Sequence, residues 1–498
     1  MGSLALRVKS ACPAGRRRYK KYNNGMNTYS ISMSMHAFGR KRLIERLQKR
    51  GISENAVVLL QGGVSRMKYD TDREFLFEQE SFFQYLFGVK EPGFYGAIHV
   101  SSGKSILFIP HLPEEWGVWM GKIHSPSDFQ QTYEVDDVQY VDELTSTLQT
   151  LKADPLLLLH GPNSDSGLMA TPAQFSGIEG FKTDFEILHT ELVECRVLKS
   201  EEEIRLLRWI NGISSEAHME VMRQCKPGLM EYQLEAAFLH YIYDRGGCRF
   251  TAYTCICGCG PNSAVLHYGH QGAPNNRMLK DGEMFLNDSG AQYHGYASDI
   301  TCSYPVNGTF TAEQREIYSA VLASNRAVQQ AMKPGISWPD MHRLSVRVIA
   351  ERLRDIGIIQ GSVDDLIANH IPALFMPHGL GHFMGLDVHD PGGYPEGTSR
   401  IDEPGIRSLR CGRKLESGMV ITVEPGVYFI DAVLEPALSN PAVSQFLVPN
   451  KLKFFRNFGG VRIEDDVLVT PKGSENFTRV PRQIHEVEAV MEGEAVSV

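Results

Sequence analysis

The sequence predicts an α+β protein, with an N-terminal α/β domain and a larger second domain built from two similar halves. Three observations lead to this fold class. The 498 residues exceed the size of one ordinary domain. Short apolar strands alternate with helical segments in the first third of the chain. Farther along, two distant segments repeat one pattern of glycines, apolar residues and an acid.

The composition is that of a globular protein and argues against two classes of partner. Hydrophobic residues make up 42% and charged residues 22% of the chain. The net charge of −9 is modest for this length, so we expect no nucleic-acid partner. No apolar run reaches the length of a membrane span, so we expect no membrane partner.

The first 36 residues are predicted to be a basic, disordered extension. No Asp or Glu occurs before Glu45, whereas ten of the first 44 residues are Lys or Arg. An acid-poor start rich in Arg and Ser is typical of an organelle transit peptide. Because no amphipathic helix precedes residue 37, we favour a disordered tail or a start at Met26, Met33 or Met35. Organelle targeting stays open as the second interpretation.

The cysteines indicate a reducing compartment. The nine cysteines are scattered, and the closest group, Cys255, Cys257 and Cys259, lacks the C-x-x-C spacing of zinc and redox sites. An odd, scattered set is typical of free thiols. We therefore expect a cytoplasmic protein, with a structural metal site at this cysteine group as an alternative.

Residues 37–190 are predicted to form the N-terminal α/β domain. It begins with a helix over 37–51, which ends at Gly51. Four apolar runs follow, separated by polar and turn-rich segments, and each is predicted to be a strand. These strands span 56–63, 93–100, 104–110 and 155–162.

A domain boundary is predicted near residue 190, so that the second domain spans 191–498. Ser200 and Glu203 have the spacing of a capping box, and apolar residues then recur at helical spacing up to Pro227. A second helix is predicted over 231–247, ahead of mixed strands and helices.

The second domain contains an internal repeat. "GEMFLNDSG" (282–290) and "GMVITVEPG" (418–426) both read glycine, five residues, an acid, one residue, glycine. Their partners "SDITCSYPVNG" and "IEDDVLVTPKG" both run from an acid through a strand to a proline turn. Each half therefore offers two strands that carry acids, namely Asp288 with Asp299 and Glu424 with Glu464.

Carboxylates that converge in this way need cations. Four of them cannot share a pocket in the ionised form without positive charge among them. Arg462, two residues from Glu464 and on the same strand face, is one candidate. One arginine is too little charge for four acids, so one or two divalent metal ions are predicted.

Histidines near these acids would supply nitrogen ligands. "PHGLGHFMGLDVHDPGGYPEG" (377–397) contains His378, His382 and His389, and "SAVLHYGHQGAP" contains His267 and His270. Ligation by oxygens and one imidazole favours Mn²⁺, with Mg²⁺, Co²⁺ or Zn²⁺ as alternatives. Two such ions would activate a bridging water and polarise a carbonyl, which points to hydrolysis.

The order Asp, Asp, His, Glu, Glu resembles that of the pita-bread metallopeptidases, which include methionine aminopeptidase, aminopeptidase P and prolidase. Five longer segments resemble the eukaryotic prolidases, which are Xaa-Pro dipeptidases: "YTCICGCGPNSAVLHYGH", "YASDITCSYPVNG", "MPHGLGHFMGLDVHDPGGYPEG", "RIDEPGIRSLR" and "GGVRIEDD". The likeness covers roughly residues 37–490. It implies a pita-bread catalytic domain, whose duplicated α+β halves share an antiparallel sheet, and a homodimer.

The resemblance also implies roles for single residues. Two divalent ions per subunit, expected to be Mn²⁺, would be held by Asp288, Asp299, His382, Glu424 and Glu464. The catalytic residues would be Glu424, His267, His378 and His389. The substrate-binding residues would be His267, His389, Arg410, Arg462, Tyr253, Ile256 and Trp119. Arg410 would take the free carboxylate of a dipeptide, and Trp119 would come from the other subunit. The chain departs from the family at Cys259, where serine is usual.

The expected activity is hydrolysis of Xaa-Pro dipeptides. Our mechanistic hypothesis is attack on the scissile carbonyl by a hydroxide that bridges the two metals, with Glu424 as the proton shuttle. The first alternative is an aminopeptidase P-like enzyme, which removes the residue before proline from longer peptides and lacks the carboxylate clamp. The second is a non-catalytic binding module on the same fold; such relatives lose metal ligands, whereas this chain keeps all five.

Overall fold

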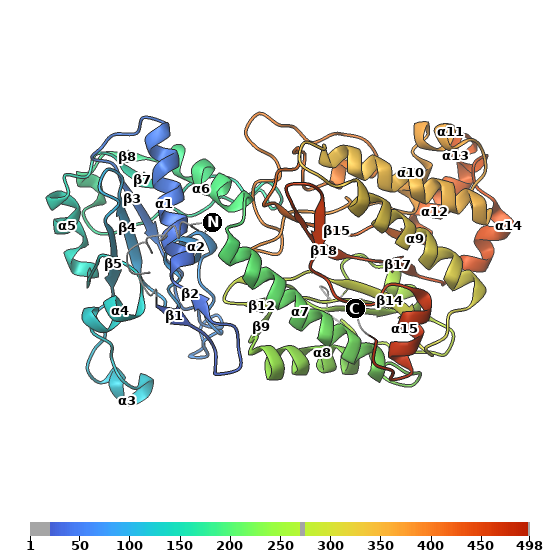
Figure 1. Ribbon diagram of the computed structural model, residues 1–498, viewed down its shortest axis with the longest axis horizontal. Coiled ribbons are helices and arrows are strands. Elements are labelled where there is room, and N and C mark those ends of the chain that lie inside the picture. The colour runs from blue at the N-terminus through green and yellow to red at the C-terminus, as the bar shows by residue number, and fades with distance from the viewer. Residues whose placement is uncertain (1–19, 269–273, 497–498) are drawn as a thin grey trace, which may run out of the picture.

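The computed structural model describes residues 20–268 and 274–496, and Figure 1 shows two parts side by side. The N-terminal domain, coloured blue to cyan, lies on the left, and the second domain, green to red, lies on the right. Strands and helices are mixed in both parts, which confirms the predicted α+β class.

Residues 20–36 belong to the predicted disordered extension, yet they are folded. β1 (Lys21–Tyr22) pairs with β2 (Ile31–Ser32) in a small antiparallel hairpin. The side chains of Tyr22 and Ile31 are buried in the main core, which offsets the entropy lost on ordering the hairpin. This corrects the expectation of disorder for this stretch; the rest of the extension lies outside the described residues.

The N-terminal domain is a six-stranded mixed sheet in the order β6-β5-β4-β3-β7-β8, covered on both faces. In β3, Val58 and Leu60 pack in the same core cluster as the helix α1. The alternate residues Val57 and Leu59 pack with α5 on the other face. The bounds are β3 Val57–Gln61, β4 Tyr95–His99, β5 Ser105–Ile109, β6 Asp137–Tyr140, β7 Leu156–Leu158, β8 Thr183–Asp184, α1 Ser34–Lys49, α2 Ser81–Phe87, α3 Trp116–Met120, α4 Pro126–Thr132 and α5 Leu144–Thr150.

Two helices connect the domains. α6 (Ile187–Val197) runs across the predicted boundary at residue 190, so that division remains a prediction. α7 (Glu201–Gln224) begins at the predicted capping box: the Ser200 hydroxyl accepts from the Glu203 N–H, and the Glu203 carboxylate accepts from the Ser200 N–H. In Figure 1 α7 crosses the lower half of the second domain.

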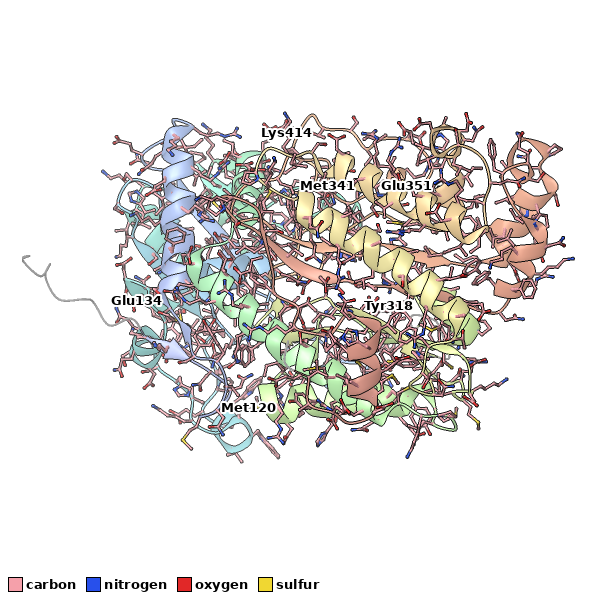
Figure 2. All side chains as sticks on the ribbon, turned by 45° about the vertical axis from the view of Figure 1, so that its right-hand side comes forward. Met120, Glu134, Tyr318, Met341, Glu351 and Lys414 are labelled. Atoms are coloured by element: carbon pink, nitrogen blue, oxygen red, sulfur yellow. The ribbon has the colours of Figure 1, made fainter. Side chains whose placement is uncertain are left out.

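The second domain repeats one plan twice. In the first half the helices α7 and α8 precede the antiparallel pair β11 and β14, and in the second half α9 and α10 precede the pair β15 and β18. The two helix pairs lie on the outside of the strands, in green and in yellow to orange in Figure 1, and Figure 2 labels Tyr318 on α9 and Met341 on α10. A bridge between Thr301 and Glu464 joins the two halves.

The remaining bounds are α8 Glu231–Gly246, β9 Phe250–Thr251, β10 Ile256–Cys259, β11 Met284–Asp288, β12 Ala291–Tyr293, β13 Tyr296–Ala297, β14 Thr301–Pro305, α9 Ala312–Ala331, α10 Trp338–Ile356, α11 Val363–Ala368, β15 Val420–Val423, β16 Gly426–Tyr428, α12 Asp431–Ser439, α13 Pro441–Ser444, α14 Pro449–Leu452, β17 Gly460–Arg462, β18 Asp465–Val469, β19 Ser474–Asn476 and α15 Ile484–Met491. None of the described helices combines the length and hydropathy of a segment that crosses a membrane.

Candidate active site

Strand register brings the predicted acids of both halves to Thr301. Asp288, the last residue of β11, lies opposite Thr301 of β14. Asp299 precedes Thr301 by two residues, and alternate residues of an extended chain share a face. The bridge from Thr301 to Glu464 then adds an acid of the second half. The Thr301 hydroxyl donates to Glu464 Oε2 at 2.6 Å, which fixes that carboxylate.

The fourth acid follows from the equivalent strand pair. Val423 of β15 lies opposite Asp465 of β18, so the next positions, Glu424 and Glu464, flank that pair on the same side. Asn325 of α9 donates its amide to the carbonyls of Val423 and Ile463 at 3.0 and 3.4 Å. The buried amide therefore ties the two acid-bearing strands to the helix behind them.

His382 completes the group. Its Nε2 lies 3.4 Å from Asp299 Oδ2 and 3.6 Å from Glu424 Oε1. Potential ligand atoms of Asp299, His382 and Glu464 all lie within 4.8 Å of one another. Asp288 joins them through Tyr253, whose hydroxyl lies 2.6 Å from both Asp288 Oδ1 and Asp299 Oδ1. The five predicted ligands thus form one cluster.

The hydrogen bonds of His382 suit a metal ligand. Nδ1 donates to the Phe383 carbonyl at 3.0 Å, so in the neutral ring Nε2 carries the lone pair and faces the carboxylates. The glycines of "HGLGH" allow this approach, since a Cβ on Gly381 would lie 2.0 Å from the Thr422 carbonyl oxygen.

The electrostatics of the cluster call for added positive charge. Burial, with repulsion from Asp299 and Glu424, raises the pKa of Glu464 well above its usual value. Burial also raises the pKa of Glu424 to about 7 and that of Asp288 above its ordinary value. Burial alone would lower the pKa of His382, but Asp299 and Glu424 raise it to about 9. Four acids against one arginine and one imidazole form a donor set that fits divalent cations.

Arg462 is held inside the cluster. Its guanidinium donates to Asp288, to the Tyr428 hydroxyl at 2.8 Å and to the Thr301 hydroxyl at 3.0 Å. The Tyr428 hydroxyl in turn lies 3.0 Å from His378 Nε2. Arg462 therefore supplies charge to the acids and also places a pocket histidine.

Two of the histidines that line the pocket, His378 and His389, are neutral at physiological pH. Burial lowers the pKa of His378 to about 3 and that of His389 to about 2. Nδ1 of His378 donates to the Gly379 carbonyl at 2.8 Å, so both of its ring nitrogens bind protein groups. The ring of His389 stands edge-on to that of His382, with centroids 4.4 Å apart. His389 is therefore free of charge next to the acid cluster.

One cavity of about 430 Å³ unites these residues, a size within the range of small-molecule sites. Among the residues that line it are twelve of the thirteen predicted from the sequence: Tyr253, Ile256, His267, Asp288, Asp299, His378, His382, His389, Arg410, Glu424, Arg462 and Glu464. The acid cluster and the guanidinium group of Arg410 therefore face the same small space.

Trp119 is the exception. It lies on α3, 83% exposed, together with the exposed Trp116, Val118 and Met120. Figure 1 shows α3 at the lower left, at the outer end of the N-terminal domain, and Figure 2 labels Met120 at the lower edge of the molecule. Within one chain, Trp119 does not line the cavity.

The N-terminal domain also reaches the cavity rim, which the sequence did not indicate. Asp165 Oδ2 lies 3.3 Å from Arg410 NH1, and Asp165 Oδ1 lies 2.6 Å from Arg400 NH2. The carbonyl of Ser164 accepts from the same Arg400 nitrogen at 3.0 Å. No motif marks Asp165, because its importance arises from contacts with residues more than 200 positions away.

The comparisons with known proteins agree with this geometry. The model of "Metallopeptidase family M24" matches residues 205–471, more than half of the chain. The chain belongs to metallopeptidase family M24. The model "Aminopeptidase P, N-terminal domain" matches residues 36–157. The resemblance inferred from the sequence motifs is thereby confirmed.

Relatives from this family match nearly the whole chain. Human Xaa-Pro dipeptidase is 56% identical over 470 residues, which cover 94% of this chain and 95% of the relative. Mouse Xaa-Pro dipeptidase is 55% identical over 473 residues, 95% of this chain and 96% of the relative. The solved structure of Pseudomonas aeruginosa aminopeptidase PepP superimposes with a TM-score of 0.76 at 32% identity, covering 94% and 99% of the two chains. The structure of zinc-substituted Escherichia coli aminopeptidase P in complex with product superimposes with a TM-score of 0.73 at 30% identity. The match covers 93% of this chain and 99% of that chain.

Proposed function

We propose that this chain hydrolyses Xaa-Pro dipeptides with two divalent metal ions. The observation that carries the proposal is one cavity of about 430 Å³. The acid and imidazole cluster and the Arg410 guanidinium all line it. The human and mouse relatives that match most of this chain are Xaa-Pro dipeptidases, which supports the choice of substrate.

The residues that would hold the ions are Asp288, Asp299, His382, Glu424 and Glu464. When bound, the ions would supply a water activated for attack and a Lewis acid for the carbonyl. We propose Mn²⁺, because ligation by many carboxylate oxygens and one imidazole suits a borderline-hard cation.

Glu424 is the residue that we propose for proton transfer. Its side chain is 18% exposed, whereas those of Asp288, Asp299 and Glu464 are 11%, 7% and 2% exposed. It is thus the acid most open to the cavity and best able to pass a proton to a leaving nitrogen. The neutral ring of His389 and the ring of His267 would hydrogen-bond to the substrate or to the oxyanion that develops on it.

Arg410 would bind the carboxylate of the second residue of the substrate. A guanidinium and a carboxylate form a charge-assisted pair that is often bidentate. The proline nitrogen carries no N–H, so recognition depends on ring shape, for which Tyr253 and Ile256 form the wall. A longer peptide would lack the carboxylate at this distance.

One set of observations favours a second candidate, the release of the residue before proline from longer peptides. The solved structures that superimpose on this chain are aminopeptidases P. Cleavage of Gly-Pro and Gly-Pro-Ala in Mn²⁺ decides between the two. We expect kcat/KM to be at least about tenfold higher for Gly-Pro, the value of one lost charged contact. A preference for Gly-Pro-Ala would overturn the dipeptidase proposal and leave the metallopeptidase intact.

We also propose that the active form is a homodimer in a reducing compartment such as the cytoplasm. The exposed apolar side chains of Trp116, Val118, Trp119 and Met120 suit burial by a second copy, through which Trp119 would reach the partner's pocket. All eight described cysteines are free and buried, which supports a reducing compartment. Sedimentation equilibrium tests the dimer, because a mass of 55.7 kDa at micromolar concentration would contradict it.

A further inference from the structure

A buried carboxylate outside the acid cluster binds a segment that lines the pocket. Glu231, the first residue of α8, is completely buried. Among the described residues it makes no ion pair, although an unpaired buried charge is costly. Hydrogen bonds compensate for the missing cation: four donors lie within bonding distance of its two oxygens. They are the Cys259 N–H at 2.7 Å, the Asn262 amide at 3.1 Å, the Tyr268 hydroxyl at 2.7 Å and the Arg277 N–H at 2.9 Å.

These donors come from both ends of one stretch of chain. Cys259 ends β10, and Arg277 returns to α8, where its carbonyl accepts the Glu231 N–H at 2.9 Å. The Glu231 side chain thereby joins the end of β10 to the backbone at Arg277. Arg277 also forms an ion pair with Glu283, whose Oε1 accepts from Arg277 NH2 at 2.6 Å. This pair stabilises the Arg277 end of the stretch.

The same stretch forms part of the substrate cavity. Leu266 and His267 line the cavity, and the next residue, Tyr268, is the one bound to Glu231. Leu266 and Tyr268 also pack in a small apolar cluster with Ile256 of β10. The position of His267 therefore depends on a segment in which Asn262 and Tyr268 are hydrogen-bonded to Glu231.

We propose that Glu231 is a positioning residue of the active site, which holds the segment 259–268 so that His267 faces the substrate. The inference rests on the proposed function, in which His267 binds the substrate. A carboxylate is required because all four partners are donors. A glutamine would turn one acceptor oxygen into an NH₂ group that faces donors. Loss of the anchor should therefore act through His267 and leave the metal ligands in place.

Double-mutant cycles with Gly-Pro as substrate test this inference. We expect Glu231→Gln to lower kcat/KM about 20-fold and Tyr268→Phe, which removes one of the four donors, about fivefold. In the His267→Ala background both losses should shrink to less than about twofold, because the group being positioned is gone. Tyr241→Phe is the matched control: it removes a tyrosine–glutamate hydrogen bond of α8, to Glu216 at 3.0 Å, away from the cavity.

The outcomes separate clearly. If Glu231→Gln and Tyr268→Phe lower kcat/KM as much in the His267→Ala background as in the unmodified chain, the damage is general and the inference is overturned. Full activity of Glu231→Gln and Tyr268→Phe in the unmodified background would also overturn it. If Glu231→Gln does not fold, Tyr268→Phe carries the test. Amide hydrogen exchange at Cys259 and Arg277 is read in parallel, and unchanged protection in Glu231→Gln also overturns the inference. If the unmodified chain does not cleave Gly-Pro, the proposed function fails, and the cycle is run with the Xaa-Pro peptide that it does cleave.

Discussion

At the scale of single residues, the proposed chemistry depends on charged groups that neighbouring side chains hold in place. Arg410 shows how such a charge is prepared. Its side chain is 30% exposed, and Asp165 holds NH1 at 3.3 Å, so the guanidinium is oriented before substrate arrives. Preorganisation of this kind lowers the entropy that binding must overcome.

Arg410→Ala should raise KM for Gly-Pro about 10- to 100-fold with little change in kcat, because a charge-assisted hydrogen bond to the substrate is lost in ground state and transition state alike. Steady-state kinetics in saturating Mn²⁺ measure this. Arg407→Ala is the control, since Arg407 lies on the same segment and pairs only with Asp402 at 3.4 Å among the described residues. An unchanged KM would remove Arg410 from the clamp.

His36 provides a pH-dependent contribution to stability. The ring is fully buried; Nδ1 donates to the Tyr85 carbonyl at 3.0 Å, and Nε2 accepts from the Tyr22 hydroxyl at 2.9 Å. Burial lowers the pKa of His36 from 6.5 to about 4. Below pH 6.5 the unfolded chain therefore binds a proton that the folded chain rejects, so stability is full above pH 6.5 and falls as the pH decreases toward 4.

Between pH 7.5 and 5 this residue should lower the free energy of unfolding by about 2 kcal/mol. Urea unfolding at the two pH values measures the change. In His36→Gln, which keeps a donor and an acceptor, the drop should be smaller by that amount. An equal drop in both proteins would show that His36 is not the group responsible.

At the scale of elements, the two halves of the second domain meet where Thr301 bridges to Glu464, and Arg482 binds to both sides of this bridge. Its guanidinium donates to the Thr301 carbonyl at 2.9 Å and to the Glu464 carbonyl at 2.6 Å, and it pairs with Asp465 at 2.7 Å. The Arg482 side chain therefore clamps the bridge between Thr301 and Glu464, which brings the acids of both halves together.

Arg482→Lys keeps the charge but cannot span both carbonyls, so the two sets of metal ligands should fit the ions less well. We expect Mn²⁺ affinity, measured from the metal dependence of activity and by calorimetry, to fall about tenfold. The exposed neighbour Arg479, changed to Lys, should bind Mn²⁺ as the unmodified chain does. Equal affinities in all three proteins would show that the clamp does not influence the ligands.

At the scale of the whole molecule, the acid cluster couples metal binding to folding. The carboxylates are buried, and the pKa values of Glu424 and Glu464 are raised. Without cations, repulsion among these carboxylates therefore destabilises the folded state. Dialysis against a chelator should abolish Gly-Pro cleavage and lower the thermal midpoint. Mn²⁺ at about 1,000 times its Kd should restore activity and add about 4 kcal/mol to the free energy of unfolding.

Asp299→Asn serves as the control for metal removal, because it should lose both the activity and the response of the thermal midpoint to Mn²⁺. Full activity after exhaustive chelation would contradict the metal-dependent mechanism. Retention of metal by Asp299→Asn would instead favour the cysteine group Cys255, Cys257 and Cys259, although burial raises the pKa of all three thiols.

Much of the fold and of the candidate site was predictable because the signals are local. The capping box at Ser200 depends on two residues three positions apart, and the structure has it as predicted. The repeated pattern around Asp288 and Glu424 marks two equivalent strand ends, which the structure places in equivalent antiparallel pairs. The folded hairpin at Tyr22 and Ile31 was missed, because its stability comes from a core that the other domain elements form.

The sequence by itself determined the chemistry that is available: which carboxylates, imidazoles and guanidinium groups stand at strand ends and glycine-rich turns, and to which family the chain belongs. The tertiary structure alone decided which of them meet. The pairs Asp165 with Arg410, Glu231 with Tyr268, and Arg482 with the Glu464 carbonyl are contacts between distant parts of the chain. Such contacts depend on how whole layers pack, and local spacing carries no record of that packing.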